Sequence, residues 1–297
     1  MKQIVSAPTH ATVARGSAAG QLPRFRLGEE ITAEQAAFLD EHGFLLFDRV
    51  ASLDEVAMLC AELDQVEAGW LAEGRRAVNG IPIFYGRRGH RPWVQRFAFT
   101  SLFSEAMRRF VRDLRFEPIR RLVGDRARVG DDEKDGVVVN RYLNAPGSVS
   151  AELGWHTDGL RDLFYLRMPQ AMLNVGLHLD DCPAENGGLR LIPGSHRQGF
   201  ASMCFHKPYF VGHAPDPDEV VIETRPGDLT VHDGRLWHRV ARSERRGDAS
   251  LRRSLYVPYL TGPYEPKSES SRTPAYHHLG RLQRAWRARP RRGASSA

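Results

Sequence analysis

The chain has 297 residues, of which 41% are hydrophobic and 26% are charged. This composition supports a packed core and excludes collagen-like, coiled-coil and disordered proteins. No apolar run approaches the roughly 18 residues that a membrane-spanning helix needs, so a transmembrane class is excluded. The three cysteines are far apart and form no CxxC motif, which excludes a disulfide framework and fits a reducing compartment. We therefore expect a cytoplasmic protein.

The formal net charge of +6 is concentrated at the two ends of the chain. Residues 281–297 contain six Arg and no acid, and residues 1–28 contain four basic residues and no acid. Residues 29–280 hold 32 basic and 36 acidic residues, a net charge of −4. We therefore expect a flexible leader over 1–28, one domain over 29–280 and a flexible basic tail over 281–297. None of these predicts a specific nucleic-acid partner.

Two capping boxes predict where the first helices begin. Thr-Ala-Glu-Gln at 32–35 and Ser-Leu-Asp-Glu at 52–55 both place a hydroxyl three residues before a Glu or Gln. Gly43 predicts the end of the first helix, and the apolar run 44–47 predicts a short buried strand. The apolar spacing over 101–123 predicts a further amphipathic helix.

The pattern changes near Gly130. Short runs with two-fold alternation, such as GVVVNRYL and GDLTVHD, are separated by Gly, Pro and Asp turns. Many short strands favour a sandwich or a closed double sheet over alternating βαβ units. No Rossmann, P-loop, GxSxG or HExxH motif is present. We predict a mainly β protein, with a helical N-terminal layer over about 29–125 and a jelly-roll-like core over about 130–262.

One constellation in this core has the residue types of a metal site. In Gly-Trp-His-Thr-Asp-Gly at 154–159, His156 and Asp158 project from the same face of a strand. His238 follows 82 residues later. Two His and one carboxylate make the facial triad of non-haem iron oxygenases, which leaves positions open for further ligands. An isolated HxD pair is more often a surface or core-satisfied histidine.

An arginine pair follows the distal histidine. Arg252 and Arg253 lie 14 and 15 residues after His238 and open an apolar strand. A guanidinium at the inner end of that strand would form a fork for one carboxylate, such as the distal end of 2-oxoglutarate. The alternative is a solvated strand end.

The chain from about Thr32 to Leu260 resembles the phytanoyl-CoA dioxygenase-like Fe(II)/2-oxoglutarate oxygenases. The segments EHGFLLFDRVASLDEV and NVGLHLDD, the turn Glu-Asn-Gly-Gly at 185–188 and the sequence Pro-Gly-Ser-His at 193–196 carry this resemblance. The HxD pair, the distal His and the strand Arg occur in the family order. The resemblance implies a double-stranded β-helix, Fe(II), 2-oxoglutarate as cosubstrate and O₂. It also implies iron ligation by the residues that match the family motif: His156, Asp158 and His238.

The sequence departs from the family pattern at two places. Val240 stands where several members have a small hydroxyl residue, and SERRGDAS lengthens the interval between the distal His and the Arg. Matching the flanking residues favours Arg252 for the cosubstrate, with Arg253 facing outward. A slip of one residue would exchange the two.

Other ligand sets are open at this point. His178 and Asp180 form a second HxD on a predicted strand, and His232 could replace His238. His196 and Glu185 are interpreted as loop residues.

The surroundings of the site contain candidate contacts. Asn174 shares a strand face with His178 and is a candidate cosubstrate contact. The His-rich segment 273–280 could form a lid or cover a sheet edge. Side chains near the predicted ligands are candidate substrate contacts, although the aromatic ones could equally belong to the core: Trp155, Tyr142, Trp237, Phe164 and Arg161.

The favoured function is a non-haem Fe(II)- and 2-oxoglutarate-dependent dioxygenase that hydroxylates or otherwise oxidises a small molecule, natural products included. Related halogenases have Gly or Ala at the position of Asp158, so the carboxylate here favours hydroxylation. Two alternatives are an O₂-independent metal-dependent isomerase or epimerase, and a non-catalytic binding or sensor protein. No membrane partner is expected, and the substrate is not named by the sequence.

Overall fold

The computed structural model describes residues 22–165, 168–210, 212–274 and 277. Its helices are α1 (Ala33–His42), α2 (Leu53–Glu73), α3 (Glu105–Val111), α4 (Glu117–Val123) and α5 (Phe200–Phe205). Short 3₁₀ helices are η1 (Thr100–Leu102), η2 (Leu114–Phe116), η3 (Gly159–Tyr165), η4 (Ala184–Asn186), η5 (Ser195–Arg197) and η6 (Gly247–Ser250). In the described part of the chain, no helix is long and apolar enough to cross a membrane.

The strands form two main sheets and a small hairpin. The large sheet has the order β1-β12-β9-β14-β7-β5-β4, and β6 also pairs with β14. Its strands are β1 (Phe44–Phe47), β4 (Phe84–Arg88), β5 (Arg91–Phe97), β6 (Arg128–Val129), β7 (Val138–Tyr142), β9 (Met172–His178), β12 (Leu229–Asp233) and β14 (Arg252–Leu260). The second sheet has the order β11-β10-β13-β8. It consists of β8 (Leu153–His156), β10 (Gly188–Leu191), β11 (Val220–Val221) and β13 (His238–Ala241). The hairpin joins β2 (Ala77–Val78) to β3 (Ile81–Pro82).

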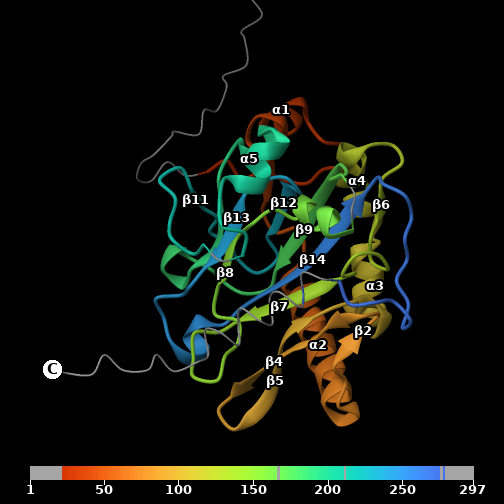
Figure 1. The fold of residues 1–297 in the computed structure, drawn as a ribbon, viewed down its shortest axis with the longest axis vertical. Coiled ribbons are helices and arrows are strands. Elements are labelled where there is room, and N and C mark those ends of the chain that lie inside the picture. The colour runs from red at the N-terminus through yellow and green to blue at the C-terminus, as the bar shows by residue number, and fades with distance from the viewer. Residues whose placement is uncertain (1–21, 166–167, 211, 275–276, 278–297) are drawn as a thin grey trace, which may run out of the picture.

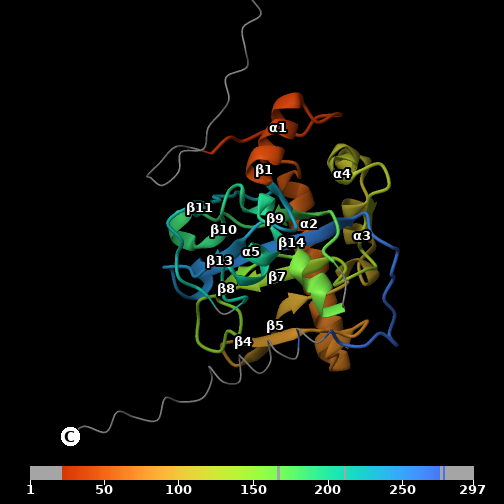
Figure 2. The ribbon, with the colours of Figure 1, turned by 45° about the horizontal axis from the view of Figure 1, so that its top comes forward.

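The four-stranded sheet lies on one side of the central strands of the large sheet, and α2 and α3 lie on the other (Figures 1 and 2). The main hydrophobic core joins α2 and α3 to the large sheet, with Leu59, Phe97 and Val231 fully buried in it. A smaller cluster is built around Trp155 and Trp237. The prediction of a mainly β protein with additional helices is confirmed.

The N-terminal predictions are confirmed at the capping boxes. The hydroxyls of Thr32 and Ser52 accept from the backbone three residues on, and both reciprocal bonds are present. Gly43 ends α1 in the left-handed region, with φ of 82°. The predicted strand at 44–47 is β1.

One expectation for residues 29–125 is wrong, and a second is incomplete. The helix predicted over 101–123 is divided into η1, α3, η2 and α4, because Ser104 and Asp113 cap new starts and Pro118 belongs in a first turn. The layer also contains strands that extend the large sheet, since β5 pairs with β7 and β4 pairs with β5. That pairing joins segments that are distant in sequence, so local patterning does not reveal it.

Candidate iron and 2-oxoglutarate site

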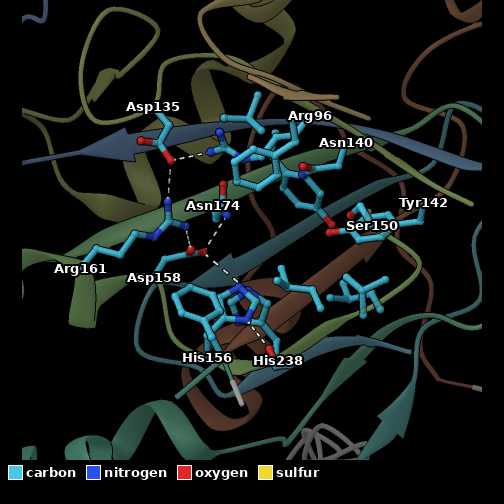
Figure 3. A pocket seen from close by; sticks show the side chains of 18 of the residues that line it. Arg96, Asp135, Asn140, Tyr142, Ser150, His156, Asp158, Arg161, Asn174 and His238 are labelled. Atoms are coloured by element: carbon cyan, nitrogen blue, oxygen red, sulfur yellow. Dashed lines mark hydrogen bonds and ion pairs between the residues drawn. The ribbon is translucent and has the colours of Figure 1, made fainter. Parts of the chain in front are cut away.

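Strand pairing brings the three predicted metal ligands together. His156 is the last residue of β8, His238 is the first of β13, and the two are direct partners across the antiparallel pair. Asp158 follows β8 by two residues. Ligand atoms of the three side chains lie within 4.8 Å of one another, and all three residues are buried. Figure 3 shows their side chains converging on one point.

Both histidines are oriented by their own backbone. Nδ1 of His156 lies 2.9 Å from the carbonyl oxygen of Gly154, and Nδ1 of His238 lies 3.0 Å from that of Leu236. These contacts place the proton on Nδ1 and leave each Nε2 lone pair for a metal. Burial, aided by the charge of Arg161, lowers the pKa of His156 to about 3. The imidazole is therefore neutral near pH 7, as metal ligation requires.

Two neighbours hold the two oxygens of Asp158. Arg161, one turn later in η3, forms an ion pair with Oδ1. Asn174 on β9 donates from Nδ2 to Oδ2 at 2.7 Å. Arg161 is itself held by Asp135, to which it donates a hydrogen bond of 3.1 Å. The carboxylate of Asp158 is therefore held by Arg161 on one side and by Asn174 on the other (Figure 3).

A cavity of about 270 Å³ opens from these residues. On the side away from the histidines, its wall is formed by Arg96 on β5 and by Asn140 and Tyr142 on β7 (Figure 3). Arg96 bonds Asp135 at 2.6 Å through Nη2. Burial alone would raise the pKa of Asp135, but neighbouring cations, Arg96 first, hold it well below its usual range. This wall therefore carries charged side chains that form an ion pair with each other.

Arg252 is buried and faces inward. Its Nη1 donates to the carbonyl oxygens of Asn186 (2.5 Å) and Ala241 (2.7 Å), and Nη2 donates to that of Ala151 (3.0 Å). Its Nε has no hydrogen-bond partner, and no acidic side chain of the described residues lies within ion-pair distance of its guanidinium. The side chain lines a small cavity that shares Tyr142 with the main one. A buried cation without an acid calls for an anionic ligand.

Arg253 faces the other side of β14. Its side chain forms a two-pronged ion pair with Asp180, at 2.9 Å and 2.7 Å. The predicted orientation of the two arginines matches this arrangement. Asp180 is also the acidic residue of the alternative HxD pair. The histidine of that pair, His178, contacts the hydroxyl of Thr230 at 3.0 Å. His178 and Asp180 therefore belong to separate contacts.

Known proteins match most of the chain. A profile of the family described as phytanoyl-CoA dioxygenase (PhyH) matches residues 39–246. A probable alpha-ketoglutarate-dependent hypophosphite dioxygenase from Stutzerimonas stutzeri is 25% identical over 220 residues, which cover 69% of this chain and 71% of that protein. An ectoine dioxygenase from Sphingopyxis alaskensis is 28% identical over 169 residues, covering 56% of this chain and 50% of that protein. The match thus spans about half the length of the ectoine dioxygenase.

The chain belongs to the phytanoyl-CoA dioxygenase family. It is a non-haem dioxygenase that uses iron and 2-oxoglutarate. Among solved structures, the non-heme alpha ketoglutarate dependent carbocyclase SnoK from nogalamycin biosynthesis shares the fold, with a TM-score of 0.58 at 20% identity. That likeness covers 86% of this chain and 92% of SnoK.

The predicted substrate contacts of the dioxygenase fall into two groups. Tyr142 and Arg161 line the cavity. Trp155 and Trp237 lie in the smaller core cluster, so their positions match the core alternative. The side chain of Phe164 lies outside the described residues.

Three remaining sequence interpretations are placed by the structure. Asn174 lines the cavity, but the contact it makes is with Asp158. His196 contacts the carbonyl oxygen of Asp40 at 3.0 Å, and Glu185 pairs with Arg245 at 2.6 Å, as loop residues do. Of the His-rich segment, His277 is described and lies 3.7 Å from Asp135, while 275–276 and 278–280 fall outside the described residues.

Sequence reasoning missed several residues of this site. Arg96 and Asp135 come from segments interpreted as part of or next to the helical layer. Phe210, whose ring stacks on His156 at a centroid distance of 4.8 Å, follows a loop without a motif. No local signal marks these three, because tertiary packing alone brings them to the site.

Proposed function

We propose that this dioxygenase hydroxylates a small molecule, with His156, Asp158 and His238 as iron ligands and Arg252 as the anchor of 2-oxoglutarate. The observation that carries the proposal is the combination of two kinds of site in two neighbouring cavities that share Tyr142 and Tyr256 in their walls. One is a buried two-His, one-carboxylate set, and the other is a buried arginine without an acid partner. We also propose that residues 29–280 act as one catalytic domain on a double-stranded β-helix.

The donor set fits iron. Two neutral imidazoles and one carboxylate are the ligands of non-haem Fe(II) oxygenases, and they leave positions for a chelating cosubstrate and O₂. When bound, iron couples oxidative decarboxylation of 2-oxoglutarate to O₂ activation and supplies the oxidant for a C–H bond. The part of the chain is to hold the ligands, orient both substrates and exclude water.

Arg252 suits the distal carboxylate of 2-oxoglutarate. Three carbonyl oxygens fix the guanidinium and leave its Nε–H for a further acceptor. Tyr142, directly opposite on β7, covers it with its ring at 5.7 Å. Burial raises the pKa of Tyr142 to about 12, so its hydroxyl stays protonated and can donate to the same carboxylate.

The surroundings of His156 help to exclude water. Phe210 stacks on the imidazole, and the hydroxyl of Tyr209 donates to the carbonyl oxygen of Thr157 at 2.6 Å. An apolar cover and a fixed backbone beside Asp158 keep the ligands in one arrangement. A dry site protects a reactive oxidant from side reactions.

Asp158 favours hydroxylation as the outcome. Its carboxylate is tied to Arg161 and Asn174, which keeps it at the ligand position and leaves no room there for a halide. The ligand set therefore argues against halogenation, and oxygen transfer to a substrate carbon is the outcome we propose.

The far wall supports a polar substrate that carries oxygen. Arg96 has a buried Nη1 without a hydrogen-bond partner, and Asn140 is its direct cross-strand neighbour. Donors in this position suit a carboxylate or hydroxyl of the substrate. The relatives are named for hypophosphite and ectoine, which are small molecules too.

The test is an anaerobic titration of the apoprotein with Fe(II) and then 2-oxoglutarate. We expect the weak visible charge-transfer band of the iron chelate in the wild type and its loss in His156→Ala. His196→Ala, which removes a buried histidine outside the site, should retain the band. Wild-type protein that binds iron without a band on addition of 2-oxoglutarate would contradict the oxygenase and favour the O₂-independent enzyme.

A further inference from the structure

His232, the alternative ligand in the sequence, lies beside the metal ligands but is not one of the three. It sits on β12 directly opposite Asn174 on β9, and opposite residues of an antiparallel pair share a face. Nε2 of His232 lies 3.4 Å from Oδ2 of Asp158. Its ring also packs against that of His238, with centroids 4.5 Å apart. His232 lines the main cavity.

Neither ring nitrogen of His232 has a hydrogen-bond partner among the described residues, although the side chain is 1% exposed. The 3.4 Å contact with Asp158 does not meet hydrogen-bond geometry. Both the neutral and the protonated imidazole carry at least one N–H, so this side chain has a donor to satisfy. Buried polar groups without partners are rare in native proteins and point to a bound partner.

The neighbouring histidines make the contrast clear. His156 and His238 each use Nδ1 on a backbone carbonyl, and His178 uses Nε2 on the hydroxyl of Thr230. Of these four buried imidazoles, His232 alone makes no hydrogen bond. Its Nε2 lies next to the Asp158 carboxylate, in the lining of the cavity that opens from the three proposed ligands.

We propose that His232 is a further ligand-binding residue of this site. It hydrogen-bonds an oxygen of the group held beside Asp158, which is either a carboxylate or keto oxygen of 2-oxoglutarate or a metal-bound water. The inference rests on the proposed iron and 2-oxoglutarate function. His232 would then act on how the cosubstrate is held, without binding the iron itself.

The experiment compares His232→Phe and His232→Gln with the wild type under anaerobic conditions. The Fe(II) dissociation constant is measured first, and that of 2-oxoglutarate is then measured from the charge-transfer band. We expect His232→Phe to weaken 2-oxoglutarate binding by about 10-fold and leave Fe(II) binding within about 2-fold. A 10-fold loss in the Fe(II) arm alone would identify water as the partner. His232→Gln, which keeps a donor, should recover part of either loss.

A second readout uses the apoprotein and needs no metal. Because His232 has no partner there, replacement by an apolar ring of similar size should not lower the midpoint of urea unfolding. His178→Phe, which removes a hydrogen bond to Thr230, should lower it. Unchanged dissociation constants and an unchanged band in His232→Phe would overturn the proposal, and so would a loss of apoprotein stability equal to that of His178→Phe. Absence of the band in the wild type would instead overturn the oxygenase function.

Discussion

His156 and His238 face each other across β8 and β13, with ring centroids 4.0 Å apart. The register of this pair shifts by a β-bulge between His238 and Val240. Regular pairing thus ends at the ligands, where a bulge redirects side chains. One pair of neighbouring strands therefore presents both imidazoles, and the residue two after His156 supplies the carboxylate.

Substitutions at the two adjacent arginines should have very different effects on the binding of 2-oxoglutarate. Arg252→Met should raise the dissociation constant of 2-oxoglutarate by at least about 30-fold, since it removes the charge that a buried carboxylate would meet. Arg253→Met is the matched control on the outer face and should change that constant by less than about 2-fold. It should lower the free energy of unfolding by about 0.5–1 kcal/mol through loss of the pair with Asp180. Titration of the charge-transfer band measures the dissociation constants of both variants, and urea unfolding measures the change in stability. Equal effects of the two substitutions on the dissociation constant would contradict the assignment.

Asn174 should act on iron affinity through Asp158. Loss of a hydrogen bond to a metal ligand typically costs about 10–100-fold in affinity, and Asn174→Ala removes such a bond. Competition with a chelator measures the Fe(II) constant. Asn140→Ala, on the far wall of the same cavity, should leave Fe(II) affinity unchanged. If Asn174→Ala bound iron as the wild type does, the carboxylate would be held by other contacts.

The apoprotein should lose stability below neutral pH because of His178. Burial lowers the pKa of His178 to about 3, whereas an unfolded histidine titrates near about 6.5. The unfolded chain therefore binds a proton first, and the stability contributed by neutral His178 is full above about pH 6.5 and is lost as the pH falls toward 3.

The matched variant is His178→Gln, which keeps a donor for Thr230 but does not titrate. Between about pH 6 and pH 4, the unfolding free energy of the wild type should fall relative to this variant by up to about 1.4 kcal/mol per pH unit. Urea unfolding at each pH provides the measurement. Parallel curves for the two proteins would show that His178 is not responsible.

Gly176 is required by the ring of Tyr256. A Cβ at Gly176 would lie 2.1 Å from Cε1 of Tyr256, a residue that lines both the main cavity and the cavity of Arg252. Gly176→Ala should therefore lower the free energy of unfolding by about 1–3 kcal/mol. In Tyr256→Leu the clash is absent, so the same substitution should cost much less there. Additive losses in this double-mutant cycle would show that the ring is not the obstacle.

Local signals in the sequence were sufficient to select three residues that the fold brings together, and to find the first two helix starts. His156 and Asp158 stand two apart on a strand, and strand parity placed Arg252 and Arg253 on opposite faces. Parity gives the face of a residue but not its distance to a partner. For that reason Asn174 was assigned to the correct side, whereas its contact with Asp158 could not be foreseen. Arg96 reaches the site only because β5 pairs with β7, a contact between distant segments that no local pattern encodes.

The loop that carries Phe210 is joined by its backbone to the strand that carries His156. Phe210 N–H donates to the carbonyl oxygen of Trp155, and Trp155 N–H donates to that of Gly212, both at 2.8 Å. A change of substrate range made in this loop would therefore disturb the metal ligand at the same time. The wall formed by β5 and β7 shares no strand with the three ligands, but Arg96 is connected to Asp158 through Asp135 and Arg161. New substrate preferences that retain the iron chemistry are therefore expected from changes outside that chain of contacts, such as at Asn140.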